Sequence, residues 1–271
     1  VPLILGYVHL QIASSLTSRS PLDNVPKKGH ETWTTSTSGC TRCPKFFGLG
    51  NQKAGTTLVV KALASALQVG VDSDLPIAQF PSQFYDDVKK GDYYSKGKLC
   101  SMFPDPPVDM TKEGHLTLFY QEIRQICPVT RFYFVVRHPL DNVMSIMDRV
   151  GMDPDELWKA PGSLTFWQSG WRDVLFMGYA GINEPSILET LIARWNRMAR
   201  LFLNAPKGSI SLVRFEDLVS PESRVSELRR ISRELGFAHP DIKGALAQFN
   251  VTQQTQGRHH GQDPRQVLGT R

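Results

Sequence analysis

Eight consecutive residues, 50–57 (GNQKAGTT), have the residue types of an anion-binding loop. Gly50 and Gly55 permit a tight turn, Lys53 supplies a positive charge, and Thr56 and Thr57 supply hydroxyl donors. The run follows a short apolar segment and precedes one rich in Ala and Leu, so it connects a predicted strand to a predicted helix. Backbone N–H groups at a helix N-terminus face an anion, and the helix dipole favours negative charge there. The sequence therefore predicts a phosphate-binding loop.

This loop differs from the nucleoside triphosphatase loop, G-x-x-x-x-G-K-[ST]. The two glycines match, but Thr56 stands in place of the lysine, and the lysine lies earlier, at Lys53. The shift disfavours an ATPase or kinase, although a P-loop kinase of a small metabolite, using ATP and Mg²⁺, remains the alternative. A binding module that has lost catalysis while keeping the nucleotide fold is a third hypothesis. The presence of Lys53, Arg137 and Ser145 counts against it.

A second pair of residues has a spacing suited to phosphate. Arg137 directly follows the apolar run 131–136 (RFYFVV), and Ser145 lies eight residues later, in a predicted helix. An arginine supplies a charge-assisted hydrogen bond to a phosphate, and a serine supplies a hydroxyl donor.

Three segments resemble cofactor motifs of the sulfotransferase family. Residues 52–57 (QKAGTT) resemble its P-K-S-G-T-T loop, residues 135–145 (VVRHPLDNVMS) its 3′-phosphate motif, and residues 214–218 (RFEDL) its R-Y-E-D-L segment. The resemblance implies 3′-phosphoadenosine-5′-phosphosulfate (PAPS) as the donor and adenosine 3′,5′-bisphosphate as the product. Gln52, Ala54 and Leu58 depart from the family pattern. The resemblance also implies a set of cofactor-binding residues: Gly55, Thr56, Thr57, Arg137, Ser145, Phe215 and Arg258. The resemblance places Phe215 near adenine, and the alternative is that Phe215 is an aromatic residue of the core. Arg258 is included because of a weak match to the family's R-K-G segment.

The implied reaction is in-line transfer of a sulfuryl group to a hydroxyl or an amine of an acceptor. It depends on positioning and on neutralising charge at the leaving oxygen, a role suited to Lys53. His115 is the predicted general base, because KEGHL at 112–116 resembles the family's K-T-H-L and imidazole titrates near working pH. Asp72 and Asp74 are the alternatives. No metal is required by this scheme.

The rest of the chain predicts the fold that positions these groups. Strands are expected at 45–50, 131–136 and 210–213, and helices at 57–69, 116–126, 140–150, 187–203 and from Ser220-Pro221 to Gly236. Strands separated by helices indicate an α/β fold with a central parallel sheet flanked by helices, similar to P-loop NTPases. We expect one sulfotransferase-like domain over 44–271, after a segment, 1–43, that begins apolar and continues as a flexible Ser/Thr/Pro-rich stem or linker.

The composition limits the function less than the motifs do. The net charge is +5, with +2 in residues 1–43, +2 in residues 254–271 and only +1 between them, so it gives no support for a polyanionic acceptor. We expect a small-molecule or carbohydrate acceptor and no nucleic acid. The stem favours the Golgi over the cytoplasm, with a possible membrane anchor upstream of Val1. The four cysteines favour free thiols or a disulfide over zinc, because the C-x-x-C at Cys40 and Cys43 has no second pair.

Overall fold

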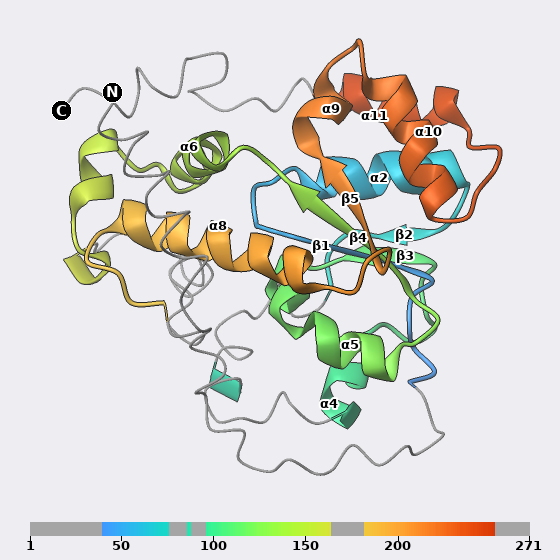
Figure 1. Cartoon of the computed structure of the whole chain (residues 1–271), viewed down its shortest axis with the longest axis horizontal. Coiled ribbons are helices and arrows are strands. Elements are labelled where there is room, and N and C mark those ends of the chain that lie inside the picture. The colour runs from blue at the N-terminus through green and yellow to red at the C-terminus, as the bar shows by residue number, and fades with distance from the viewer. Residues whose placement is uncertain (1–39, 76–85, 88–95, 164–181, 253–271) are drawn as a thin grey trace.

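The central element is a five-stranded sheet in which every paired strand is parallel to its neighbour (Figure 1). The computed structural model describes residues 40–75, 86–87, 96–163 and 182–252. Within them the strand order is β2-β3-β1-β4-β5. The strands are β1 (Phe46–Gly50), β2 (Val71–Asp72), β3 (Met110–Lys112), β4 (Arg131–Val136) and β5 (Ile210–Arg214). The predicted α/β fold with a central parallel sheet is confirmed.

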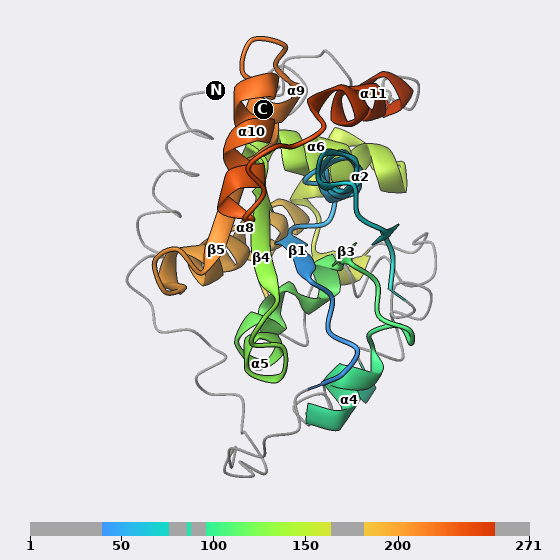
Figure 2. The same cartoon turned by 90° about the vertical axis from the view of Figure 1, so that its right-hand side faces the viewer.

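Helices cover both faces of this sheet, as Figures 1 and 2 show. One face carries α2 (Thr56–Leu67), α10 (Arg224–Glu234) and α11 (Ile242–Thr252), with the short α9 (Phe215–Val219) beside them. The other face carries α4 (Lys96–Ser101), α5 (Tyr120–Ile126) and α8 (Ile187–Asn204). The remaining long helix, α6 (Pro139–Val150), packs against α8 in a separate apolar cluster.

The central strands are apolar on both sides because both sides are buried. Along β4, Phe132 and Phe134 join the cluster under α5 and α8, whereas Tyr133 and Val135 join the cluster under α2 and α10. Successive side chains of a strand point to opposite faces, so a strand covered by helices on both faces reads as a continuous apolar run. The run 131–136 was interpreted in this way, and β4 has those bounds.

The connections between strands define where a ligand can bind. The chain leaves β1 through α2 toward β2, and it leaves β4 in the opposite direction toward β5. In an open parallel sheet, the carboxyl ends of two neighbouring strands whose connections diverge form the usual ligand crevice. The loop after β1 and the segment after β4 meet at this place.

Two predicted helices differ from the structure. Residues 116–126 do not form one helix, because a 3₁₀ helix, Gly114–Phe119, precedes α5. The helix expected from Ser220-Pro221 begins only at Arg224. Ser220 instead closes α9, since its N–H donates to the carbonyl of Glu216 (3.0 Å). The Arg224 side chain then donates to the last carbonyls of α9, so the two helices are joined by a turn.

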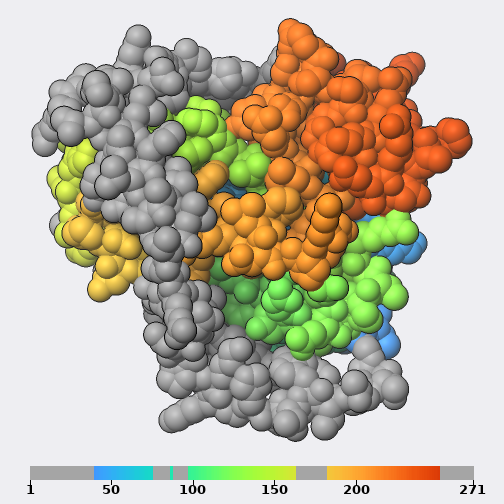
Figure 3. All heavy atoms as spheres, viewed as in Figure 1, coloured from blue at the N-terminus to red at the C-terminus, as the bar shows by residue number. Residues whose placement is uncertain are grey.

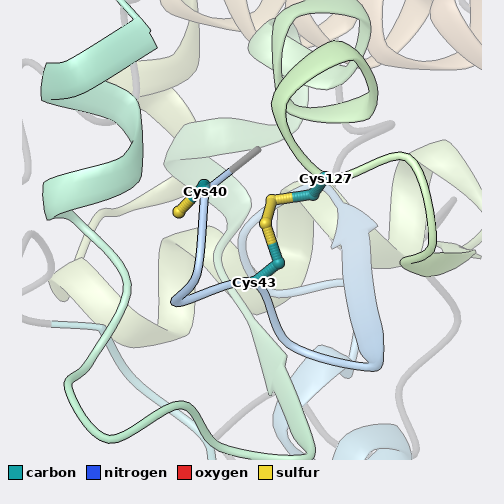
Figure 4. A group of neighbouring side chains, drawn as sticks. All are labelled: Cys40, Cys43 and Cys127. Carbon is teal, nitrogen blue, oxygen red and sulfur yellow. A yellow bond between two sulfur atoms is a disulfide. The ribbon is translucent and has the colours of Figure 1, made fainter. Parts of the chain in front are cut away.

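All four cysteines form disulfides at the end of the sheet where β1 and β4 begin. Cys43 is bonded to Cys127 (Figure 4), and Cys40 is bonded to Cys100. Of the two alternatives that the sequence left open, free thiols or a disulfide, the structure has the second, and the two cysteines of the C-x-x-C have different partners. The bonds tie the segment before β1 to α4 and to the end of α5. No helix in the described ranges has the length and apolar character needed to cross a membrane.

Candidate active site

The loop after β1 has the backbone of an anion cradle. Lys53 and Gly55 both have positive φ, 66° and 90°, and the N–H of Ala54 donates to the carbonyl of Asn51 (3.1 Å). The loop leads directly into α2, where no side chain caps the start of the helix and the first turn has no acidic residue. The backbone N–H groups in the first turn of α2, a helix of twelve residues, are therefore suited to binding an anionic group. Of the two threonines, Thr56 is buried and Thr57 is exposed.

Gly55 is held against the aromatic ring that follows β5. A Cβ at position 55 would lie 2.1 Å from Cε2 of Phe215, so only glycine fits there. The guanidinium of Arg137 lies over the same ring, 5.0 Å from its centroid. Phe215 therefore packs between the loop and the predicted phosphate-binding arginine. Such a cation–π contact fixes the guanidinium plane while leaving its N–H groups to donate.

Arg137 joins the ends of β1 and β4. Its Nη1 donates to the carbonyl of Lys53 (3.3 Å), and its own carbonyl accepts from Nε1 of Trp195 in α8 (2.9 Å). A small cleft here is lined by Asn51, Arg137, Trp195 and neighbouring residues of β4 and α8. Figure 3 shows a hollow between α6 and α9, above α8, with atoms of the early, blue part of the chain at its bottom. The structure thus brings the two predicted phosphate motifs together.

The amine of Lys53 lies in a positive environment. Burial lowers its pKa, the guanidinium groups of Arg149 and Arg137 lower it further, and the carboxylate of Asp148 opposes them. A lowered pKa makes the ammonium a better proton donor, which suits a group placed on a leaving oxygen. Ser145 lies on α6, as predicted, and is half-buried. Arg258 lies outside the described residues.

His115 is buried at the end of β3, next to an acid that sequence reasoning did not select. The backbone N–H of His115 donates to Oε1 of Glu113 (3.1 Å), and the imidazole Nε2 lies 3.7 Å from the same oxygen. Burial raises the pKa of Glu113 to about 7, and burial together with Arg194 and Lys112 lowers the pKa of His115 to about 3. The imidazole is therefore neutral at pH 7, as a base must be. A signal for Glu113 was present in the sequence, because the E-G pair in KEGHL departs from K-T-H-L.

The alternative bases lie in a more distant strand or just after it. Asp72 is in β2, two strands away from β1 in the sheet. Asp74 accepts a charge-assisted hydrogen bond from Nζ of Lys112 (2.7 Å), so its carboxylate is already paired. His115 follows β3, which is paired directly with β1, so in the order of the sheet it is nearer to the loop than either aspartate.

A buried polar network supports the loop from behind, and sequence reasoning missed it. The carbonyl of Gln52 accepts from Nδ2 of Asn142 (3.0 Å), and its Oε1 accepts from Nη2 of Arg194. Thr117 both accepts from the N–H of Gly50 (3.0 Å) and donates to its carbonyl (3.1 Å). Gln52 stands where the family loop has proline, and this substitution was the one available signal.

Of three comparisons with known proteins, one found matches. No protein-family model and no curated protein matches this chain. Among solved structures, a sulfotransferase from Alicyclobacillus acidocaldarius matches with a TM-score of 0.45 and 14% identity, over 79% of this chain and 97% of that one. The sulfotransferase domain from the curacin biosynthetic pathway matches with a TM-score of 0.41 and 15% identity, over 77% and 78%. Both of these solved structures are described as sulfotransferases.

Proposed function

We propose that this protein is a sulfotransferase that moves a sulfuryl group from PAPS to a hydroxyl or an amine of an acceptor. One observation carries the proposal: the loop after β1 and Arg137 after β4 are joined through Phe215 and the carbonyl of Lys53, and in the proposal they act as a single anion-binding unit. This unit offers the N–H groups at the start of α2, which no side chain caps, on one side and the guanidinium of Arg137 on the other. Two separated phosphates of one nucleotide match that arrangement.

The residues of this unit have separate roles in the proposal. The N–H groups of Gly55, Thr56 and Thr57 hold the 5′-phosphate end, and Arg137 with Ser145 holds the 3′-phosphate. When bound, PAPS supplies an activated sulfuryl group on a phosphate leaving group. Lys53 places positive charge, and a proton, at the bridging oxygen.

His115 takes the proton of the acceptor, and Glu113 supports it. A carboxylate 3.7 Å from Nε2 stabilises the imidazolium that forms as the proton arrives. The burial that lowers the pKa of free His115 also makes this support more effective, because charges interact strongly away from water.

The proposal is tested by incubating the protein with ³⁵S-labelled PAPS and a panel of sugars, phenols, steroids and amines. We expect label in at least one class of acceptor, and none in a parallel reaction with Lys53→Ala. A panel with no labelled product, or equal labelling by the variant, would count against the proposal.

A further inference from the structure

The last turn of α11 contains a pattern that the proposed function does not use. Residues 250–252 (NVT) form an Asn-X-Ser/Thr triplet in which X is not proline, and the 271-residue sequence has no other triplet of this kind. This triplet is the acceptor pattern for N-linked glycosylation. Because three residues match by chance in many proteins, the position of the asparagine and the compartment in which the chain folds decide whether the pattern is used.

Asn250 lies on the outer side of α11. The inner side is defined by Ala245 and Phe249, which are buried in the apolar cluster that α11 shares with α2 and α10. The exposed side is formed by Lys243, Ala247 and Asn250, which are spaced four and three residues apart. The helix itself lies on the far side of α2 from the sheet (Figures 1 and 2). A large substituent on the Asn250 side chain would therefore extend into solvent without displacing the core.

The disulfides indicate that the chain folds in the compartment where such asparagines are modified. All four cysteines are paired, as Cys40–Cys100 and Cys43–Cys127. Disulfides form and persist in oxidising compartments such as the lumen of the endoplasmic reticulum, and they are rare in the cytosol. N-linked glycans are attached to chains that enter this lumen. The pairing involves residues 40–127 only, so it supports a glycan at Asn250 independently of the triplet.

We propose that Asn250 is a modification site and that the protein carries an N-linked oligosaccharide there. The co-reactant is a lipid-linked oligosaccharide diphosphate. Nδ2 of Asn250 forms a bond to the anomeric carbon of its first sugar, the bond from that carbon to the diphosphate oxygen breaks, and Nδ2 gives up one proton as the lipid diphosphate leaves. The transfer takes place on the extended chain as it enters the lumen, so the later helical conformation of α11 does not prevent it. This inference does not depend on the proposed sulfuryl transfer.

The direct test is mass spectrometry of the protein isolated from the cells that naturally make it. The protein is treated with a peptide N-glycosidase in ¹⁸O-labelled water, which releases an N-linked glycan and converts the asparagine that carried it into ¹⁸O-labelled aspartate. We expect the peptide that contains residue 250 to be recovered with this label after treatment. Recovery of that peptide with an unmodified asparagine, with or without the enzyme, would overturn the inference.

Variants of the full chain, produced in eukaryotic cells behind a cleavable secretion signal, assign the glycan to this residue. Wild type should show a single loss of mass on glycosidase treatment, and Asn250→Gln and Thr252→Ala should show none. Thr252→Ser should keep the loss, because serine also completes the triplet. Asn204→Gln is the matched control, since Asn204 is also exposed at the end of a helix but lies outside any triplet. A wild-type protein without the loss, or a loss that persists in Asn250→Gln, would contradict the inference.

Discussion

Oε1 of Glu113 lies 3.7 Å from Nε2 of His115 and accepts a hydrogen bond from the His115 backbone (3.1 Å). Both side chains are buried at the end of β3. Lys112 and Arg194 are the nearby cations, and Asp74 is the nearby acid. The pair can accept one proton with the charge shared between an imidazolium and a carboxylate.

The pair predicts a pH profile for turnover. Glu113 must be ionised to stabilise the imidazolium, and its pKa is raised to about 7. We therefore expect kcat/KM to rise with pH through an apparent pKa near 7 and to level off above it. Glu113→Gln should lower the plateau about tenfold or more and remove that rise. An unchanged profile in the variant would show that Glu113 has only a structural role.

The same pair predicts opposite pH effects on stability. The folded pKa of His115 is lowered to about 3 from 6.5, so its contribution is full above pH 6.5 and is lost as the pH falls toward 3. The folded pKa of Glu113 is raised to about 7 from 4.5, so its contribution is full below pH 4.5 and is lost as the pH rises toward 7. As the pH rises from 5 to 7.5, the unfolding free energy of Glu113→Gln should therefore increase relative to that of wild type, and that of His115→Gln should decrease relative to wild type. Urea unfolding at these two pH values measures both, and changes in the same direction would contradict this explanation.

Lys53→Ala separates binding from transfer. The variant removes the charge that we propose acts at the leaving oxygen but leaves the helix N–H groups and Arg137 in place. Turnover should fall by at least about 10³-fold, whereas the affinity for adenosine 3′,5′-bisphosphate should fall by no more than about tenfold. Single-turnover transfer and calorimetry give the two values. Normal turnover in Lys53→Ala would refute the role of this lysine.

Gly55→Ala tests the packing of the loop. Gly55 has a φ of 90°, and an added Cβ would lie 2.1 Å from the ring of Phe215. The positive φ and the overlap together should cost about 2–4 kcal/mol of unfolding free energy and abolish bisphosphate binding. Gly162→Ala is the control, because a Cβ there meets nothing within 4 Å. If both variants bind the bisphosphate normally, the loop does not have the described geometry.

Reduction of the disulfides should affect stability more than the site. The Cys40–Cys100 and Cys43–Cys127 bonds close loops of 60 and 84 residues, and each should contribute about 2–4 kcal/mol. They lie where β1 begins, whereas the proposed site lies where β1 ends. A reductant should lower the unfolding temperature by about 10 °C or more, and bisphosphate should still stabilise the reduced protein at lower temperature. No change on reduction would contradict the described pairing.

Much of the fold could be predicted because the apolar runs report burial directly. The continuous run 131–136 predicted β4, and the run 45–50 predicted β1. The short strands β2 and β3 were missed, since two or three residues give no periodicity. Ser220 was taken for a helix start because sequence spacing does not reveal that its N–H closes the preceding helix.

The candidate site was predictable where one motif lies on one element. Lys53, Gly55 and Arg137 lie in segments whose spacing carries the pattern. The departure of KEGHL from K-T-H-L marked Glu113, but its role depends on the burial of its side chain beside His115, and this spacing does not reveal burial.

The central claim is tested most directly by calorimetric titration with adenosine 3′,5′-bisphosphate, adenosine 5′-monophosphate and ATP with Mg²⁺. A site built from the loop after β1 and from Arg137 should bind the bisphosphate at least about 100-fold more tightly than the monophosphate, because the 3′-phosphate gains a charge-assisted contact. Arg137→Ala should remove most of that difference. Binding of ATP with Mg²⁺ but not of the bisphosphate would contradict the account and favour a kinase.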